Sequence, residues 1–379
     1  MVWKLAIGVG LAALLGLGAW WLLGSNGTEA GGSFELVGIY EIGTEEWRYG
    51  EMPVGEISGL AYDAAAGSYL AISDNRGDRG AAGKLYTLQI GISADGIDEV
   101  AVRDVLLLDA SREEPGVQPH AENDIDAEEI VLLGDGSLLV SSERDLEDRP
   151  WIRRYSAEGE WIGDVELPPQ FEVAEGHGVR RNLGIEAMCL AEDGRTLYAV
   201  NEQALIQDGP LADVEEGTLV RLTRFDLATQ TPSAVAQYVY RTEPIFAVPV
   251  GGGYADNGVT AMVDAAGIDP RFDLLVLERA YVEGTGNDIR LFGVDLSGAT
   301  DVSGIDALDG VREIARVAKT ELLRWSADAA ASAVPVPPDN MEAMVLGPKL
   351  ADGRATLLLA SDSNFNETQR NLFAAFATR

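Results

Sequence analysis

The sequence has few residues that carry redox, zinc or nucleophilic chemistry. Its one cysteine, Cys189, lies in an apolar run and can form no disulfide within the chain. Its two histidines, His120 and His177, fall in predicted loops, and no Gly-x-Ser-x-Gly motif occurs. These absences exclude disulfide redox chemistry, disfavour a zinc site and argue against a serine hydrolase, although His177 stays a candidate acid or base.

Basic residues are also scarce. The chain has 28 Lys and Arg against 62 Asp and Glu, a formal charge of −34. Such a charge repels nucleic acid and anionic lipid head groups, so we expect no DNA or RNA partner. Most of the acids are expected to form a solvated surface, and the remainder could bind cations.

One long hydrophobic run occurs, at the start of the sequence. Lys4 precedes an uncharged stretch from Leu5 to Leu23, which is long enough to span a bilayer. Residues 1–24 are therefore predicted to be a membrane anchor or a signal peptide, with the uncleaved anchor favoured. The positive-inside rule places the rest outside the cytoplasm, in the periplasm or at the cell surface. Residues 25–33, rich in Gly and Ser, indicate a flexible linker.

Segments with a helical period are nearly absent from residue 34 onward, and short alternating runs dominate. One hairpin unit is best preserved from Asn340 to Asn364, where two apolar runs flank a turn at Asp352-Gly353. Four weaker copies precede it. They begin near Glu56, Asp126, Gly184 and Gly258.

Two further strand-like runs follow each of the first four copies, and four short strands per repeat predict an all-β protein, a β-propeller over residues 34–379. The last copy lacks one strand, so the segment from Phe34 to Ile42 is predicted to close the ring. Five blades are favoured. A sixth blade within Lys319 to Asp339 or a β-sandwich remain alternatives. The outermost strand of the fourth copy is placed at Val311 to Ala318, and a short helix is expected from Thr320 to Ala333.

The hairpin units bring carboxylates to one rim of the ring, because antiparallel strands joined by a turn bring their far ends together. Such carboxylates repel one another unless they are protonated or a cation lies among them, and oxygen ligands favour calcium, or magnesium, over zinc. A purely structural role in turns and between blades is the alternative. The candidate metal ligands are Glu56, Asp74, Asp126, Glu143, Glu202, Glu278 and Asp362, and the candidate catalytic residues are Glu128, Glu186 and Glu342.

Three arginines follow acids of the predicted rim. Arg76, Arg144 and Arg279, together with Asn364, are candidates for binding a small anionic ester, because a guanidinium suits bidentate contacts with phosphate or carboxylate. Salt bridges to neighbouring acids are the alternative role of these arginines.

An ordered set of short motifs resembles the phytase-like domain family, described by an esterase-like activity of phytase. The motifs are Ile57-Ser-Gly-Leu60 with Ala71-Ile-Ser-Asp74, Glu128 with Asp135-Gly-Ser-Leu-Leu-Val-Ser-Ser-Glu143, Ile185-Glu186-Ala-Met188 with Asp193-Gly-Arg-Thr-Leu197, Leu277-Glu278-Arg279, and Asn340-Met-Glu342-Ala-Met344 with Ser361-Asp362-Ser-Asn364.

The resemblance covers about Phe34 to Phe376. It implies a secreted or membrane-attached β-propeller and a calcium-dependent phosphoric ester hydrolase. A lactonase-like propeller hydrolase and a non-catalytic, ligand-binding propeller are the alternatives. Lysine is limited to Lys84, Lys319 and Lys349 beyond the predicted anchor, a departure from the several basic residues expected of β-propeller phytases, so phytate itself is disfavoured. We expect a monomer that contacts the membrane through its N-terminal segment only.

Overall fold

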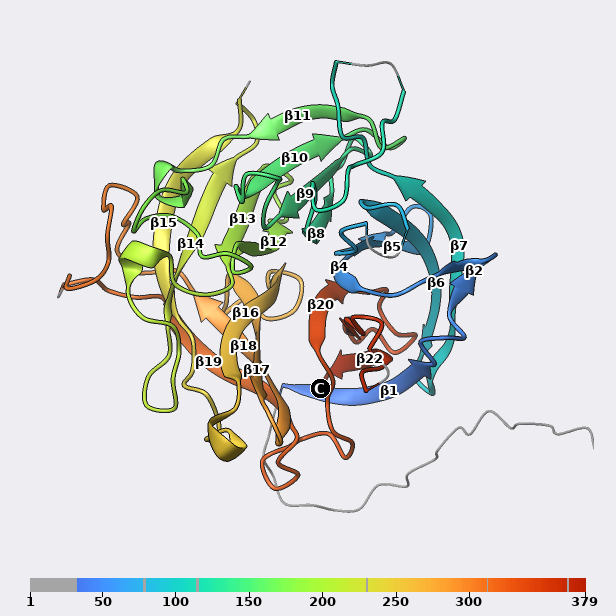
Figure 1. The fold of residues 1–379 in the computed structure, drawn as a ribbon. Helices are drawn as coiled ribbons and strands as arrows, with labels where there is room; N and C mark the ends of the chain where they lie inside the picture. The colour runs from blue at the N-terminus through green and yellow to red at the C-terminus, as the bar shows by residue number, and fades with distance from the viewer. Residues whose placement is uncertain (1–32, 78–79, 114–115, 230, 312, 367) are drawn as a thin grey trace, which may run out of the picture. The chain divides into compact units, whose positions relative to one another are not determined.

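Five four-stranded antiparallel sheets surround a central axis in the computed structural model (Figure 1). The structure describes residues 33–77, 80–113, 116–229, 231–311, 313–366 and 368–379. The predicted anchor, residues 1–24, and all of the predicted linker except Ser33 lie outside the described residues. Within the described part of the chain, no helix is long and apolar enough to cross a membrane.

Each of the first four blades runs in chain order from the axis to the outside. Blade 1 contains β4 (Ile57–Asp63), β5 (Ser68–Ser73), β6 (Lys84–Ser93) and β7 (Gly96–Leu107). Blade 2 contains β8 (Ala127–Leu132), β9 (Leu138–Ser142), β10 (Trp151–Tyr155) and β11 (Trp161–Val165). Blade 3 contains β12 (Ile185–Leu190), β13 (Thr196–Asn201), β14 (Leu219–Asp226) and β15 (Ser233–Arg241). Blade 4 contains β16 (Ala255–Asp264), β17 (Leu274–Val282), β18 (Gly286–Asp295) and β19 (Ala318–Ser326).

Blade 5 joins strands from distant parts of the sequence. It contains β20 (Met341–Leu346), β21 (Thr356–Ser361), β22 (Asn371–Thr378) and, outermost, β1 (Phe34–Ile42). The pairing of β1 with β22 runs from Phe34 opposite Thr378 to Ile42 opposite Asn371. Both the predicted closure of the ring and the five-blade count are therefore confirmed. A small hairpin of β2 (Arg48–Tyr49) and β3 (Met52–Pro53) and the short 3-10 turns η1 (Pro169–Phe171), η2 (Ile206–Asp208) and η3 (Val250–Gly252) complete the described elements.

The outer strand of blade 4 differs from the prediction. It is β19, so neither a strand over Val311 to Ala318 nor a helix over Thr320 to Ala333 is correct. The reason is packing: Trp325 is fully buried, its ring contacts that of Phe376, and its indole N–H donates to the carbonyl of Val336 at 2.6 Å. These contacts outweigh the local helical preference of the segment.

The core lies between the blades rather than within one sheet. Each of the five main apolar clusters combines residues of two neighbouring blades, as when Leu60 of blade 1 packs with Leu358 of blade 5. Both faces of the inner strands are thus covered, and β21 is buried at every position. This explains why the inner strands have continuous apolar runs in place of alternation.

A β-bulge interrupts the innermost strand of every blade at the same level of the ring. The pairing register shifts between Ile57 and Gly59 in blade 1 and at the equivalent place in the other four. A bulge leaves extra residues unpaired and re-aims their side chains. The residues within the bulges are Ser58, Glu128 with Glu129, Glu186, Thr260 and Glu342.

A buried ion pair fastens the long connection between β18 and β19 to blade 3. The guanidinium of Arg221 contacts both carboxylate oxygens of Asp208 at 2.6 and 2.7 Å, and both side chains are completely buried. Arg221 also donates to the carbonyls of Ile305 and Asp306, each at 2.9 Å, and the backbone N–H of Leu308 donates to Asp208. The pair adds to the backbone hydrogen bonds that this connection makes with β15, from Val302 to Gln237 and from Val317 to Val239.

Candidate metal centre

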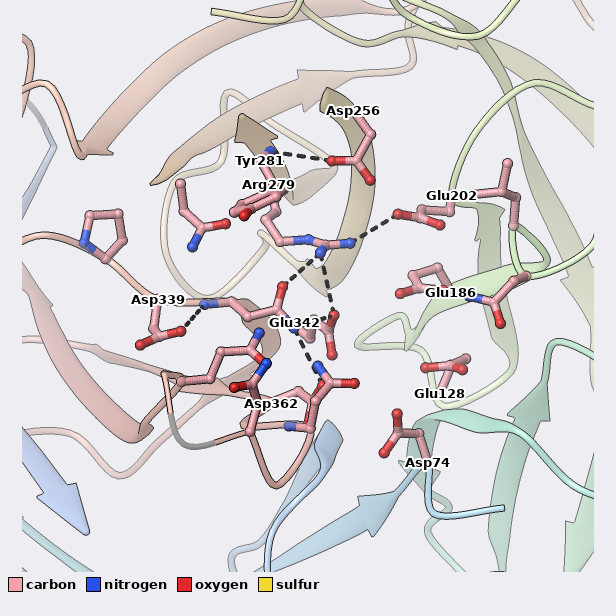
Figure 2. A pocket seen from close by; sticks show the side chains of 18 of the residues that line it. Asp74, Glu128, Glu186, Glu202, Asp256, Arg279, Tyr281, Asp339, Glu342 and Asp362 are labelled. Carbon is pink, nitrogen blue, oxygen red and sulfur yellow. Dashed lines mark hydrogen bonds and ion pairs between the residues drawn. The ribbon is translucent and has the colours of Figure 1, made fainter. Parts of the chain in front are cut away.

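A cavity of about 700 Å³ lies at the bulge level of the ring and is lined by side chains from all five blades (Figure 2). Carboxylates dominate its lining, with a few arginines and asparagines among them. The carboxylates are Asp74, Asp126, Glu128, Glu143, Glu186, Glu202, Asp256, Asp339, Glu342 and Asp362.

Two groups of these acids have the spacing of cation ligands. In each group, one carboxylate oxygen per residue lies within 4.8 Å of the others, and Glu143 belongs to both. One oxygen of Glu143 and one of Asp74 are buried with no hydrogen-bond partner among the described residues. An oxygen-only donor set with unsatisfied lone pairs fits a hard divalent cation. The two groups are Asp126 with Glu128 and Glu143, and Glu143 with Glu186 and Glu202.

Arg279 is a partly buried counter-charge in the cavity, with a side chain 13% exposed. Figure 2 shows it reaching from blade 4 toward Glu202 and Glu342. Its guanidinium lies 3.0 Å from Glu202 and 3.6 Å from Glu342, and it donates to the side-chain oxygen of Asn340 at 2.6 Å. Arg279 of blade 4 therefore interacts with an acid of blade 3 and an acid of blade 5.

Two other predicted arginines share one acid of blade 2. Arg144 lies 2.8 Å from Asp126, and Arg76 lies 3.4 Å from the same oxygen. Arg76 and Asn364 line the cavity, whereas Arg144 contacts Asp126 without lining the cavity. The arginines therefore make salt bridges with the rim acids, and Arg76 and Arg279 also face the cavity.

Besides Arg144, three residues predicted from the sequence are not among those that line the cavity. Glu56 is buried and accepts a hydrogen bond from Asn75. Glu278 is adjacent to Arg279 on β17, so its side chain points to the opposite face of the sheet, where it contacts Lys319 at 2.7 Å. His177 instead lies 3.2 Å from Asp306.

Blade 4 contributes cavity residues that the sequence analysis missed. The ladder of β16 and β17 continues for five residue pairs beyond the bulge, from Val259 opposite Glu278 to Ala255 opposite Val282. In the other blades, pairing of the two inner strands ends next to the bulge, as at Ile57 opposite Ser73. This extension places Asp256 and Tyr281 in the cavity wall. The sequence does contain a signal for this placement. Arg279 and Tyr281 alternate with Ala280 and Val282, which predicts that both polar side chains lie on one face of a strand.

Residues 52–365 match the phytase-like family, described as esterase-like activity of phytase. The chain belongs to the phytase-like family. The match covers the inner strands of all five blades, and so every acid of the two candidate ligand groups.

Further relatives of this phytase-like chain are distant. A stretch of 182 residues is 25% identical to an uncharacterized secreted protein of Arthroderma benhamiae, covering 41% of this chain and about a third (34%) of that protein. Three solved structures are similar at TM-scores below 0.5, which shows nothing about activity. The periplasmic gluconolactonase of Pseudomonas aeruginosa has a TM-score of 0.37 and 13% identity, over 86% of each chain. A calcium structure of a carbohydrate-active enzyme of family AA12 from Trichoderma reesei has a TM-score of 0.38 and 11% identity, over 86% of this chain and 82% of that chain. An alpha-L-arabinofuranosidase of Lactobacillus brevis has a TM-score of 0.41 and 10% identity, over 88% of this chain and 93% of that chain.

The acids of this phytase-like cavity are held in an environment that disfavours their charge. Burial, followed by repulsion from Glu186 and Glu143, raises the pKa of Glu128 well above its usual range. Burial and repulsion from Asp126 raise the pKa of Glu143 to about 8. Burial opposes the charge of Arg279, but the surrounding carboxylates outweigh it and raise its pKa. A divalent cation among the acids would relieve this repulsion.

These shifts predict how the stability of the metal-free protein depends on pH. A carboxyl whose pKa is higher in the folded state binds its proton more tightly there, so its contribution is complete below the unfolded pKa and is lost as pH rises through the folded pKa. With chelator present, we expect the midpoint temperature of thermal unfolding to decrease as the pH rises from about 4.3, the ordinary glutamate pKa, to about 8. Calcium should restore stability at the alkaline end. Circular dichroism melts across this range check it, and a chelated protein that gains stability toward pH 8 would contradict it.

Proposed function

We propose that this chain is an extracytoplasmic, calcium-dependent hydrolase of phosphate or related esters. The observation that carries the proposal is the two clusters of acids that share Glu143, one of which contains Glu202, the ion-pair partner of Arg279. An anionic ester is repelled by such a cavity unless cations neutralise part of it, and a cation–arginine pair then provides two attractive contacts for one anionic group. Membership of the phytase-like family supports this reaction class.

The chemistry supplied by a bound calcium ion would be polarisation of an ester oxygen and a lower pKa for a nearby water. Asp126, Glu128, Glu143, Glu186 and Glu202 are the residues that would hold it. The remaining roles belong to other groups of the cavity.

Proton transfer is assigned to one of the three bulge glutamates that line the cavity, Glu128, Glu186 and Glu342. Each is buried, projects into the cavity and has a raised pKa. A carboxylate with a raised pKa is a stronger base than an ordinary one and can take a proton from water near neutral pH. Glu342, which lies outside both ligand groups, is the best placed of Glu128, Glu186 and Glu342 for this role. Arg279, beside Glu342, orients the anionic oxygens of the ester.

The location outside the cytoplasm rests on two observations. A distant relative is described as a secreted protein, and the first residues of the sequence have the composition of an anchor or signal peptide. A fusion of a periplasmic reporter enzyme to the C-terminus would be active only if the propeller is exported.

The test of the proposed activity is metal analysis of the purified full chain, followed by hydrolysis of 4-nitrophenyl phosphate with calcium or with chelator. We expect bound calcium and turnover that the chelator removes and added calcium restores. Hydrolysis of lactones but not of phosphate esters would instead favour the lactonase-like alternative. Calcium binding without turnover of either class would favour a ligand-binding propeller, and absence of both calcium and turnover would reject the enzyme proposals together.

A further inference from the structure

The extension of blade 4 forms a wall at the mouth of the cavity. It consists of the four pairs from Gly258 opposite Arg279 to Ala255 opposite Val282, and it continues into a tight turn where Val282 pairs with Gly286 of β18. At about 3.3 Å per residue, four pairs rise up to roughly 13 Å beyond the bulge level. In each of the other four blades, one backbone hydrogen bond, such as that from Asp74 to Glu56, joins the two inner strands at the first of these levels. Above it, their inner strands have no further pairing among the described residues.

One face of this wall changes from charged to aromatic with height. Arg279 lies at its base, Asp256 and Tyr281 lie opposite each other two residues higher, and Tyr254 follows at the top. Side chains on the other face, such as Val282, are buried in the blade. The charged groups that would bind the anionic part of a ligand are therefore deep, and aromatic rings line the way out.

The ring of Tyr254 is held in place although it is 60% exposed. Its hydroxyl donates to Asp256 at 2.7 Å, and its backbone N–H donates to Glu283 at 2.8 Å. Its centroid lies 6.3 Å from that of Tyr281, with the planes inclined by 34°. An exposed ring that is already ordered loses little conformational entropy when a ligand packs against it, which is the property of a recognition surface.

We propose that Tyr254 and Tyr281 form a subsite for a ring attached to the anionic group of the substrate. The inference rests on the proposed function and narrows its substrate class to phosphate esters of ring-bearing alcohols, in which the ring presents an apolar face. Aryl groups and sugars share this chemistry, because both pack flat against tyrosine rings. Arg279 and a cation held by the acids would bind the phosphate, and the wall would hold the ring above it.

The test compares two non-hydrolysable anions with the same head group, phenylphosphonate and methylphosphonate, by titration calorimetry of the full chain in calcium. We expect the phenyl compound to bind about 5- to 10-fold more tightly, in line with the strength of aromatic pairs. The preference should disappear in Y254A and persist in Y254F, which keeps the ring and removes the hydroxyl. Tyr49, which is 38% exposed and does not line the cavity, provides the matched control Y49A.

The outcomes separate the subsite from the proposed reaction. Equal affinity for the two phosphonates overturns the subsite alone, and a preference that survives in Y254A does the same. A preference that Y254A removes supports the subsite even if no phosphate ester is hydrolysed, a result that would overturn the reaction alone. Failure of both phosphonates to bind overturns both proposals. A further arm, glucose 1-phosphate against methyl phosphate, shows whether the ring is a sugar or an aryl group.

Discussion

Replacing Glu143 by glutamine is expected to lower the affinity for calcium by a factor on the order of 100 or more, because even changes to residues behind metal ligands cost 10- to 100-fold. Glu143 belongs to both candidate ligand groups, and one of its oxygens has no partner among the described residues. Its other oxygen accepts a hydrogen bond from the N–H of Gly184 at 2.7 Å. A glutamine amide oxygen can accept the same bond, so the substitution removes the charge and keeps the local geometry.

Glu129 offers a matched control for this experiment. It lies beside Glu128 in the bulge of blade 2, it is 1% exposed, and it does not line the cavity. Burial raises its pKa well above the usual range, so a glutamine there changes little. Titration calorimetry should find calcium binding intact in E129Q and lost in E143Q, with similar thermal midpoints for the two metal-free variants. Wild-type affinity in E143Q would remove the basis for a cation at this rim.

Replacing Arg221 by methionine is expected to lower the free energy of unfolding by about 3–5 kcal/mol, the usual cost of removing one partner of a buried ion pair. The substitution would leave the Asp208 carboxylate buried without its cation and the carbonyls of Ile305 and Asp306 without their donor. Equilibrium unfolding in urea measures the loss, provided that the slope with denaturant is unchanged.

An exposed ion pair of the same chemistry provides the comparison. Arg271 contacts Asp269 at 2.6 Å, but its side chain is 68% exposed. Pairs of this kind contribute about 0–1 kcal/mol, so R271M should have little effect. If R221M costs no more than R271M, the buried pair does not fasten the β18–β19 connection. A double variant that replaces Asp208 as well should recover part of the loss, because it removes the unpaired charge.

The sequence predicted the features that follow from repetition. Each hairpin unit has its own apolar runs and turn, so the strands, the acids at their ends and the strand left over at Phe34 could all be recognised. The bulges could not, because register is a property of two paired strands. In blade 2 the sequence does not show which of two adjacent glutamates points toward the central axis. The structure shows that Glu128 lines the cavity whereas Glu129 does not.

Blade 4 was the hardest to predict for related reasons. Counting back from a degenerate repeat made Glu278 the rim acid, but the alternation of side chains along β17 gives that place to Arg279. The extension above the bulge depends on the short turn between β17 and β18, whose effect on height is visible only in three dimensions. β19 was missed because its burial comes from contacts with blade 5.

The pairing of β1 with β22 also determines when the cavity can form during synthesis. Blade 5 supplies Glu342 and Asp362 and cannot be completed until β22 has emerged and met a strand made near the beginning of the domain. Contacts between such distant segments form slowly, since a long loop must close first. We therefore expect the four earlier blades to form before the ring is closed. The acidic cavity is then completed last, after the whole domain has been synthesised.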